Sequence, residues 1–173
     1  MKLRKINHIG IIVEDIEEAA ERYGKIYGID KWYELNIEDL ELYYKEKKRD
    51  CEVKLYFGGK GFTKIELIET HGQDNAYSTF LKMQGEGMHH VMYNVRNLER
   101  AIISLEQDGM SVIQHATFRS GGANVRFAYM GWKEEGVVIE LVETEILPGI
   151  IKGDMPGEMT FFGKLTGSYR RVR

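Results

Sequence analysis

The chain opens with a short run of branched apolar residues, 5–13, which is the pattern of a β-strand. Asp15 then offers an N-cap, with Glu18 three residues on, and this capping-box arrangement is typical of a helix start. Apolar side chains recur at helical spacing beyond it, at Ile16, Ala19, Ala20 and Tyr23. Gly24 and Gly28 are candidate positions for the C-terminal end of the helix, so a strand followed by a helix is predicted.

The same order returns in the second half of the chain. Asn97 takes the cap position. The apolar stripe after it consists of Leu98, Ala101, Ile102 and Leu105. The segment 8–20 aligns without gaps on 90–102 with four identities in thirteen, and 64–70 aligns on 138–144 with five in seven. Because the order of the matches is preserved, the sequence indicates an internal duplication.

Strand-like stretches follow each predicted helix. They cover about residues 32–36, 41–46, 51–57 and 62–69 in the first half, and 111–118, 124–130 and 137–143 in the second. Each half therefore reads as a βαβββ unit, which leaves one sheet face that its helix does not cover. We expect an α+β fold of tandem βαβββ modules whose curved mixed sheets enclose a cleft.

The composition changes after residue 145. Both prolines of the chain and five of its nineteen glycines lie beyond that point. We therefore predict a single domain over 1–147, with modules at 5–70 and 88–145, followed by a Gly-rich C-terminal extension over 148–173. The extension is expected to be a surface tail or an arm packed on the body. The alternative is that its aromatic residues close a ligand cavity or a dimer seam, namely Phe161, Phe162 and Tyr169.

Composition and charge narrow the class of protein. The 173 residues are 43% hydrophobic with a net charge of -3, which favours a folded globular chain over a disordered one. The single cysteine, Cys51, excludes an internal disulfide, and no leader-like segment opens the chain. No apolar run reaches the roughly 20 residues that cross a bilayer, and a pI near 6.0 gives no general attraction to nucleic acid. The expectation is a cytoplasmic protein with a small-molecule substrate and no nucleic-acid or membrane partner.

Alternation along the strands places four metal-ligating side chains on the face turned away from the helices: His8, Glu66, His90 and Glu140. Glu140 is the most informative, because its same-face neighbours Val138 and Val142 offer nothing that would compensate a buried carboxylate. Two imidazoles and two carboxylates are a suitable ligand set for a divalent cation, with positions left for water or substrate. The expected cleft is therefore metal-centred.

Each of these residues also has an ordinary explanation. A histidine near the start of a strand, such as His8, is commonly exposed or hydrogen-bonded. Glu66 fits the solvent-exposed face of an amphipathic strand. The duplication favours the interpretation of these residues as metal ligands, because core packing by itself would favour apolar residues at the positions that match between the halves. His89 is the alternative to His90, and the gapless register with His8 selects His90. The remaining candidates lack a repeat partner and are expected to be loop, surface or small buried residues: His71, His115 and Cys51.

The four residues in tandem βαβββ units resemble the vicinal oxygen chelate superfamily, which includes glyoxalase I, methylmalonyl-coenzyme A epimerase, extradiol dioxygenases and bleomycin-resistance proteins. The resemblance spans about residues 5–145 and is most specific in NHIGIIVEDIEEA, KIELIE, FLKMQGEGMHHVMYNV and GVVIELVE. FLKMQGEGMHH and SGGANVRF are similar to the epimerase-like branch. The resemblance implies a homodimer in which His8, Glu66, His90 and Glu140 bind one divalent metal ion (Co, Mn, Ni, Zn or Fe).

For the chemistry, the resemblance implies metal-assisted proton transfer next to a carbonyl, by an epimerase or isomerase of an acyl thioester or a 2-oxo acid. The cation would stabilise a developing enolate while the carboxylates of Glu140 and Glu66 carry the proton. The identity of a second base opposite Glu140 stays open between Glu52, Lys54 and another residue. The insertion over 31–50 is expected to pack a longer sheet or to shape a pocket for a bulkier substrate.

Two other functions stay open. One is a glyoxalase-like lyase or an iron-dependent dioxygenase, in which His8, His90 and Glu140 hold iron and Glu66 stays off the metal. The other is a non-catalytic binding or resistance protein that sequesters a small molecule in the same cleft. Solvent deuterium uptake, oxygen consumption with retained iron, and ligand binding that survives metal removal would separate the three.

Overall fold

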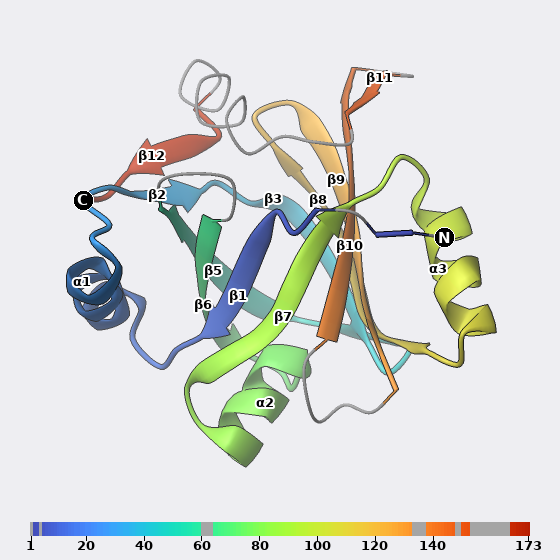
Figure 1. The fold of residues 1–173 in the computed structure, drawn as a ribbon, viewed down its shortest axis with the longest axis horizontal. Coiled ribbons are helices and arrows are strands. Elements are labelled where there is room, and N and C mark those ends of the chain that lie inside the picture. Colours follow the sequence, from blue (N-terminus) through green and yellow to red (C-terminus); the bar gives the residue numbers. More distant parts are fainter. Residues whose placement is uncertain (1, 4, 60–63, 133–137, 148–149, 153–166) are drawn as a thin grey trace.

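The computed structural model describes residues 2–3, 5–59, 64–132, 138–147, 150–152 and 167–173 (Figure 1). Its helices are α1 (Ile16–Tyr27), α2 (Ala76–Gln84) and α3 (Leu98–Gln107). Its strands are β1 (His8–Ile12), β2 (Trp32–Leu35), β3 (Glu38–Tyr44), β4 (Lys47–Arg49), β5 (Cys51–Gly58), β6 (Lys64–Gly72), β7 (Gly87–Asn94), β8 (Ser111–Ser120), β9 (Ala123–Gly131), β10 (Val138–Leu147), β11 (Ile150–Lys152) and β12 (Tyr169–Arg171). Within these ranges, none of the helices has both the length and the apolar character to span a membrane.

The strands form one mixed sheet that curls around its own concave face (Figure 1). Their order is β12-β2-β5-β6-β1-β7-β10-β9-β8-β3-β4, with β11 paired to β10 off this path. β1 pairs parallel with β6, β7 pairs parallel with β10, and β1 and β7 join the two halves as antiparallel neighbours. The expected α+β fold of βαβββ units is confirmed. The four strands that carry the candidate ligands are neighbours at the middle of the sheet.

The helices α1 and α3 start by the same device in the two halves. Their side-chain N-caps are the predicted ones, Asp15 and Asn97. A glutamate at the end of the repeated motif adds a second acceptor. Oε2 of Glu69 accepts the N–H of Ile16 at 2.8 Å, and Oε2 of Glu143 accepts the N–H of Leu98 at 2.9 Å. The repeated ELIET and ELVET sequences therefore supply a helix cap as well as a carboxylate on the concave face.

Strand alternation divides the core into an outer part and a concave part. The helix α1 packs on outward-facing side chains of the first half, which include Ile11, Val13, Trp32, Tyr56 and Leu67. The helix α3 packs on those of the second half, which include Val95, Ala128, Met130 and Leu141. Residues one position along the same strands, such as Ile12, Ile68, Met92 and Val142, are buried on the concave face instead. The alternation used to select the candidate ligands is thus correct.

The segment between the predicted modules at 5–70 and 88–145 contains a helix, α2. The helix α2 begins at Asn75, which forms a capping box with Ser78. It turns Tyr77 and Phe80 into the concave core. The comparison of the two halves gave no sign of α2, because this helix occurs once in the chain.

The insertion at 31–50 connects the two halves. The strand β2 stays beside β5 in the first half, whereas β3 crosses to pair antiparallel with β8 in the second. Leu42 and Tyr44 of β3 are buried in the concave core, and the hydroxyl of Tyr44 donates to Oγ1 of Thr79 at 3.2 Å. The insertion therefore lengthens the sheet and also lines the concave face.

The C-terminal extension ends on the sheet, where β12 pairs antiparallel with β2. Tyr169 is buried in the concave core, and its ring centre lies 6.0 Å from that of Phe57. The described part of the extension is thus an arm packed on the body, and Tyr169 contributes to the concave core. Phe161 and Phe162 lie outside the described residues. The division of the chain into 1–147 and 148–173 stays a prediction.

Removing the helix-capping glutamate of the second half tests this scaffold. Glu143→Ala is expected to lower the free energy of unfolding by about 2–3 kcal/mol, because the buried N–H of Leu98 loses its acceptor. Glu99→Ala is the matched control. It removes an exposed partner of Arg126 and is expected to cost less than about 0.5 kcal/mol. Urea unfolding followed by circular dichroism measures both variants, and equal losses would contradict the capping role.

Candidate metal centre

The four predicted ligands meet at the centre of the concave face. His8 comes from β1, Glu66 from β6, His90 from β7 and Glu140 from β10. One nitrogen or oxygen atom of each residue lies within 4.8 Å of the corresponding atoms of the others. The exposed fraction of each residue is 6% or less. The structure therefore brings the whole predicted set together in a buried position.

The spacing of the four groups suits a first-row metal ion. Nε2 of His8 lies 3.1 Å from Oε2 of Glu140 and 3.2 Å from Oε2 of Glu66. Nε2 of His90 lies 3.2 Å from the same two oxygens and 3.4 Å from Nε2 of His8. Two ligand atoms bonded at about 2.0–2.2 Å to one cation lie about 3.3 Å apart when the angle at the metal is tetrahedral, and these five distances match that separation. The donor set therefore fits a divalent cation in both chemistry and spacing.

The charges of the four groups compensate one another. Burial by itself lowers the pKa of His8, but the carboxylates of Glu66 and Glu140 outweigh it and raise this pKa to about 10. The pKa of His90 is also raised, since the same two carboxylates outweigh its burial. Burial would raise the pKa of Glu140, but His90 and His8 lower it to about 2. The pKa of Glu66 is lowered against its burial in the same way. The positive charge that these shifts favour on the imidazoles thus balances the two carboxylates in the metal-free protein.

A glycine and a β-bulge make room for the ring of His90. Gly10 pairs with His90, and a Cβ atom on Gly10 would lie 2.0 Å from Cε1 of that ring. The register then skips one residue, because Ile11 pairs with Met88, so His89 is the extra residue of the bulge. His89 lies beside His90 among concave-face rings, but it is not one of the four clustered groups. The choice of His90 over His89 as the candidate ligand agrees with this placement.

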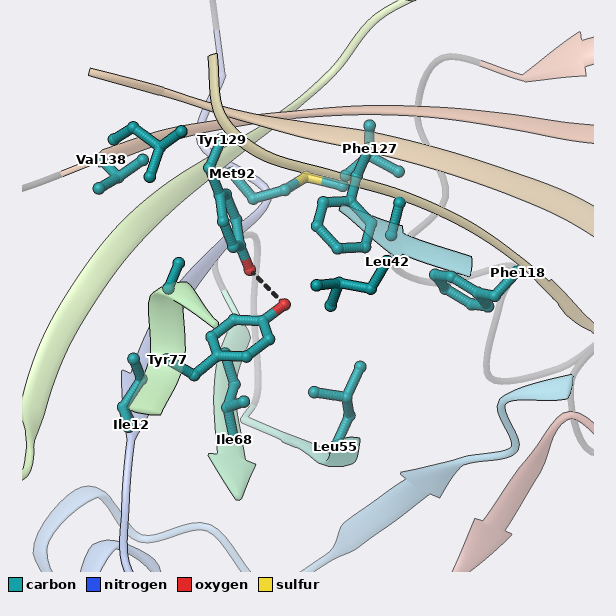
Figure 2. Close-up of a cluster of buried hydrophobic side chains, with 14 of the residues drawn as sticks. Ile12, Leu42, Leu55, Ile68, Tyr77, Met92, Phe118, Phe127, Tyr129 and Val138 are labelled. Atoms are coloured by element: carbon teal, nitrogen blue, oxygen red, sulfur yellow. Dashed lines mark hydrogen bonds between the residues drawn. The ribbon is translucent and has the colours of Figure 1, made fainter. Parts of the chain in front are cut away.

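Around the cluster the concave face is apolar, with two phenols that meet each other. Figure 2 shows buried side chains that include Ile12, Leu55, Ile68, Met92, Phe127 and Val138. The hydroxyl of Tyr129 donates to that of Tyr77 at 3.0 Å, across 52 positions of sequence (Figure 2). Burial and the charge of Glu140 raise the pKa of both phenols, so both stay protonated. The repeat does not predict this pair, because Tyr77 lies on α2, which occurs once, and the position that corresponds to Tyr129 in the first half is Phe57.

A row of polar side chains crosses the second half from the cluster. Cross-strand pairing places Glu140 opposite Tyr129, Tyr129 opposite Gln114, and Gln114 opposite Tyr44. Oε1 of Gln114 accepts the first N–H of α2 at 2.8 Å, while its buried Nε2 has no hydrogen-bond partner within the described ranges. In the first half the corresponding row is Glu66, Phe57 and Tyr33. The row of the second half therefore carries two phenols and an amide, whereas that of the first half carries one phenyl ring and one phenol.

The two residues considered as a second base do not face Glu140. Glu52 is exposed. Lys54 lies on the outer face of β5, where its Nζ donates to Oε1 of Glu17 at 3.1 Å. The candidates without a repeat partner are also outside the cluster, with His71 and His115 exposed and Cys51 half-buried. Among the residues weighed from sequence, only the repeated histidines and glutamates gather at one point.

Comparison with known protein families is in line with this arrangement. The model of the Glyoxalase/Bleomycin resistance protein/Dioxygenase superfamily matches residues 7–129. The chain belongs to this superfamily. The resemblance drawn from the sequence motifs is confirmed, and members of the superfamily bind a divalent metal.

Relatives within the superfamily include epimerases. A Bacillus subtilis (strain 168) protein called YqjC, described as uncharacterized, is 27% identical over 90% of this chain and 99% of its own. Mitochondrial methylmalonyl-CoA epimerase of Bos taurus is 27% identical over 80% of this chain and 74% of its own. A solved Streptomyces coelicolor methylmalonyl-CoA epimerase in complex with 2-nitronate-propionyl-CoA is 25% identical, with a TM-score of 0.58, and covers 82% of this chain and 94% of its own.

The close approach of Gly10 to His90 leads to a sharp substitution test. Gly10→Ala is expected to displace the imidazole of His90 and to weaken Co²⁺ binding by about 10–100-fold, the range seen when ligand orientation is disturbed. Gly87→Ala, on the strand β7 that carries His90, is the control, because the nearest atom to its added Cβ would be 3.9 Å away. Titration with Co²⁺ followed by visible absorption measures both. Unchanged affinity in Gly10→Ala would show that His90 does not bind the ion.

The pKa values of the two histidines lead to a pH prediction. Because the pKa of His8 is raised to about 10, this side chain holds a proton at neutral pH in the metal-free protein, and the raised pKa of His90 favours a proton on that ring as well. A metal ion must displace these protons, so its apparent affinity is expected to increase about tenfold per pH unit for each proton released. Calorimetry of Mn²⁺ binding between pH 6.5 and 8.0 in buffers of different ionisation enthalpy counts the protons. Affinity independent of pH would contradict the charge state described here.

Proposed function

We propose that this protein is a metal-dependent epimerase or isomerase that moves a proton next to the carbonyl of a small acyl thioester. The observation that carries the proposal is the buried set of two histidines and two glutamates at the centre of the concave face. Relatives named methylmalonyl-CoA epimerases support it, as does the neighbour solved with 2-nitronate-propionyl-CoA.

His8, Glu66, His90 and Glu140 are the residues that would hold the cation. Imidazole nitrogens and carboxylate oxygens suit Co, Mn, Ni, Zn or Fe. Such a cation, when bound, polarises a substrate carbonyl and so increases the acidity of the neighbouring C–H. The residues of the chain must then orient the substrate and carry the proton.

Glu66 and Glu140 are the proposed proton carriers. Both turn Oε2 toward the histidines of the cluster. We propose that the other carboxylate oxygen, Oε1, accepts the substrate proton and returns it. Their strands, β6 and β10, lie on opposite sides of the central β1 and β7. An epimerase needs a base on each face of the reacting carbon, and two carboxylates from opposite halves of the sheet meet this need.

The rest of the concave face would exclude water and orient the substrate. Apolar side chains surround the cluster, which strengthens the charge interactions within it. The protonated phenols of Tyr77 and Tyr129 and the amide of Gln114 are donors for substrate oxygens in the second half. The aromatic side chains of the first half suit an apolar acyl group.

Solvent exchange tests the proposal. Protein loaded with Co²⁺ in D₂O is incubated with the separate C2 epimers of methylmalonyl-CoA, and we expect deuterium at C2 together with interconversion of the epimers. His90→Ala is expected to lower the rate by at least about 100-fold, since the site loses a ligand. His115→Ala, at an exposed position outside the cluster, is the matched control and is expected to leave the rate unchanged.

The same assay separates the roles of the two carboxylates. With metal content verified, Glu66→Gln and Glu140→Gln are each expected to retain deuterium uptake from one epimer and to lose interconversion. Three outcomes would overturn the proposed function: no exchange by metal-loaded protein with a panel of acyl thioesters, oxygen consumption with retained iron, or tight ligand binding that survives metal removal without turnover.

A further inference from the structure

Two adjacent histidines of β7 lie on the same side of the sheet, which a regular strand does not allow. Successive side chains of a strand point to opposite faces, so His89 would turn outward if His90 turned inward. The bulge between the pairs Gly10–His90 and Ile11–Met88 removes this alternation. Both histidines are buried, with exposed fractions of 2% for His89 and 0% for His90.

The two rings are joined through their Nδ1 atoms, which lie 3.1 Å apart. At that separation one nitrogen carries a hydrogen atom and donates while the other accepts. Nε2 of His90 is the atom that faces Glu66 and Glu140, at 3.2 Å from each. An Nε2 that binds a metal carries no hydrogen, so the neutral ring of His90 must carry its hydrogen on Nδ1. His89 is then the acceptor.

The surroundings of His89 hold its ring in place. Three aromatic rings from α2 and β9 meet it edge-on, with ring centres at 5.2 Å for Phe80, 5.2 Å for Tyr129 and 6.0 Å for Tyr77. The angles between the plane of His89 and the planes of these three rings are 62° to 84°. Tyr77, Phe80 and Tyr129 thus form an aromatic slot that holds the imidazole of His89. An acceptor fixed in this way defines the orientation of the ring that donates to it.

We infer that His89 is a positioning residue for the metal centre: its Nδ1 accepts the Nδ1–H of His90, which orients that ring and keeps Nε2 of His90 open toward the cation. This inference rests on the metal site of the proposed function but not on the reaction. At the matching position of the first half, Asn7 instead uses its backbone, donating to Met92 and accepting from Lys64. A histidine therefore precedes only the second of the two imidazole ligands.

Substitutions at His89 separate the hydrogen bond from packing. His89→Phe keeps a ring in the aromatic slot but removes the acceptor, and is expected to weaken Co²⁺ binding by about 10–100-fold, as for other partners of metal-binding histidines. His89→Asn places an amide oxygen near the former Nδ1 and is expected to recover most of that loss. Phe80→Leu is the control, because it disturbs the same slot and removes no hydrogen bond. Its Co²⁺ affinity is expected to stay within about threefold of the unaltered chain, since packing alone is changed.

A spectroscopic measurement on the unaltered protein tests the direction of the bond without any variant. Long-range ¹⁵N–¹H spectra of the Zn²⁺-loaded chain are expected to show His89 neutral with its hydrogen on Nε2, and His90 with its hydrogen on Nδ1. His89 with its hydrogen on Nδ1 would overturn the inference, even if His89→Phe failed to fold.

The outcomes for His89 and for the proposed function are distinguishable. Unaltered protein that binds no Co²⁺ would overturn the metal site and this inference together. Unaltered protein and His89→Phe that bind Co²⁺ equally well would overturn the inference alone. Protein that binds Co²⁺, responds to His89→Phe as expected and yet exchanges no acyl thioester would support the role of His89 and overturn the proposed reaction.

Discussion

Mutual compensation between two buried imidazoles and two buried carboxylates is the interaction on which the rest of the structure depends. A lone ion in the interior costs several kcal/mol, so none of these side chains is stable there without its partners. At 3.1–3.4 Å they neutralise one another, and a divalent cation can take over that role from the protons of the histidines. The requirement explains why strands from both halves converge on one point, and why neither half forms the site by itself.

The duplicated motif serves the site and the scaffold at once. In ELIET and ELVET the first glutamate faces the cluster, while the second, three positions later, lies on the other face and accepts the first N–H of a helix. The strand alternation that separates these faces thus ties the position of each outer helix to that of a ligand. A change in register would displace both together, since a slip of one residue moves every side chain to the opposite face.

The features that occur once in the chain make the two sides of the concave face different. The helix α2, the crossing strand β3 and the terminal strand β12 contribute Tyr77, Tyr44 and Tyr169 at separate places. The bulge at His89 belongs to the second half, where Tyr129 and Gln114 also lie. A substrate whose two ends differ in polarity needs such an asymmetric surface, because a site with exact twofold symmetry would accept it in either orientation.

The sequence by itself determined the duplication, the outer helices, most strands and the four candidate ligands. The helical and strand periodicities are local and can be recognised in the sequence. The alignment of the two halves also matches each candidate histidine and glutamate with a residue of the same type in the other half. Only the tertiary structure decided that β3 crosses to β8, that α2 turns Tyr77 toward Tyr129, that Lys54 bonds Glu17 away from Glu140, and that His89 turns inward. These outcomes depend on pairing between distant segments and on one bulge, and neither leaves a periodic signal in the chain.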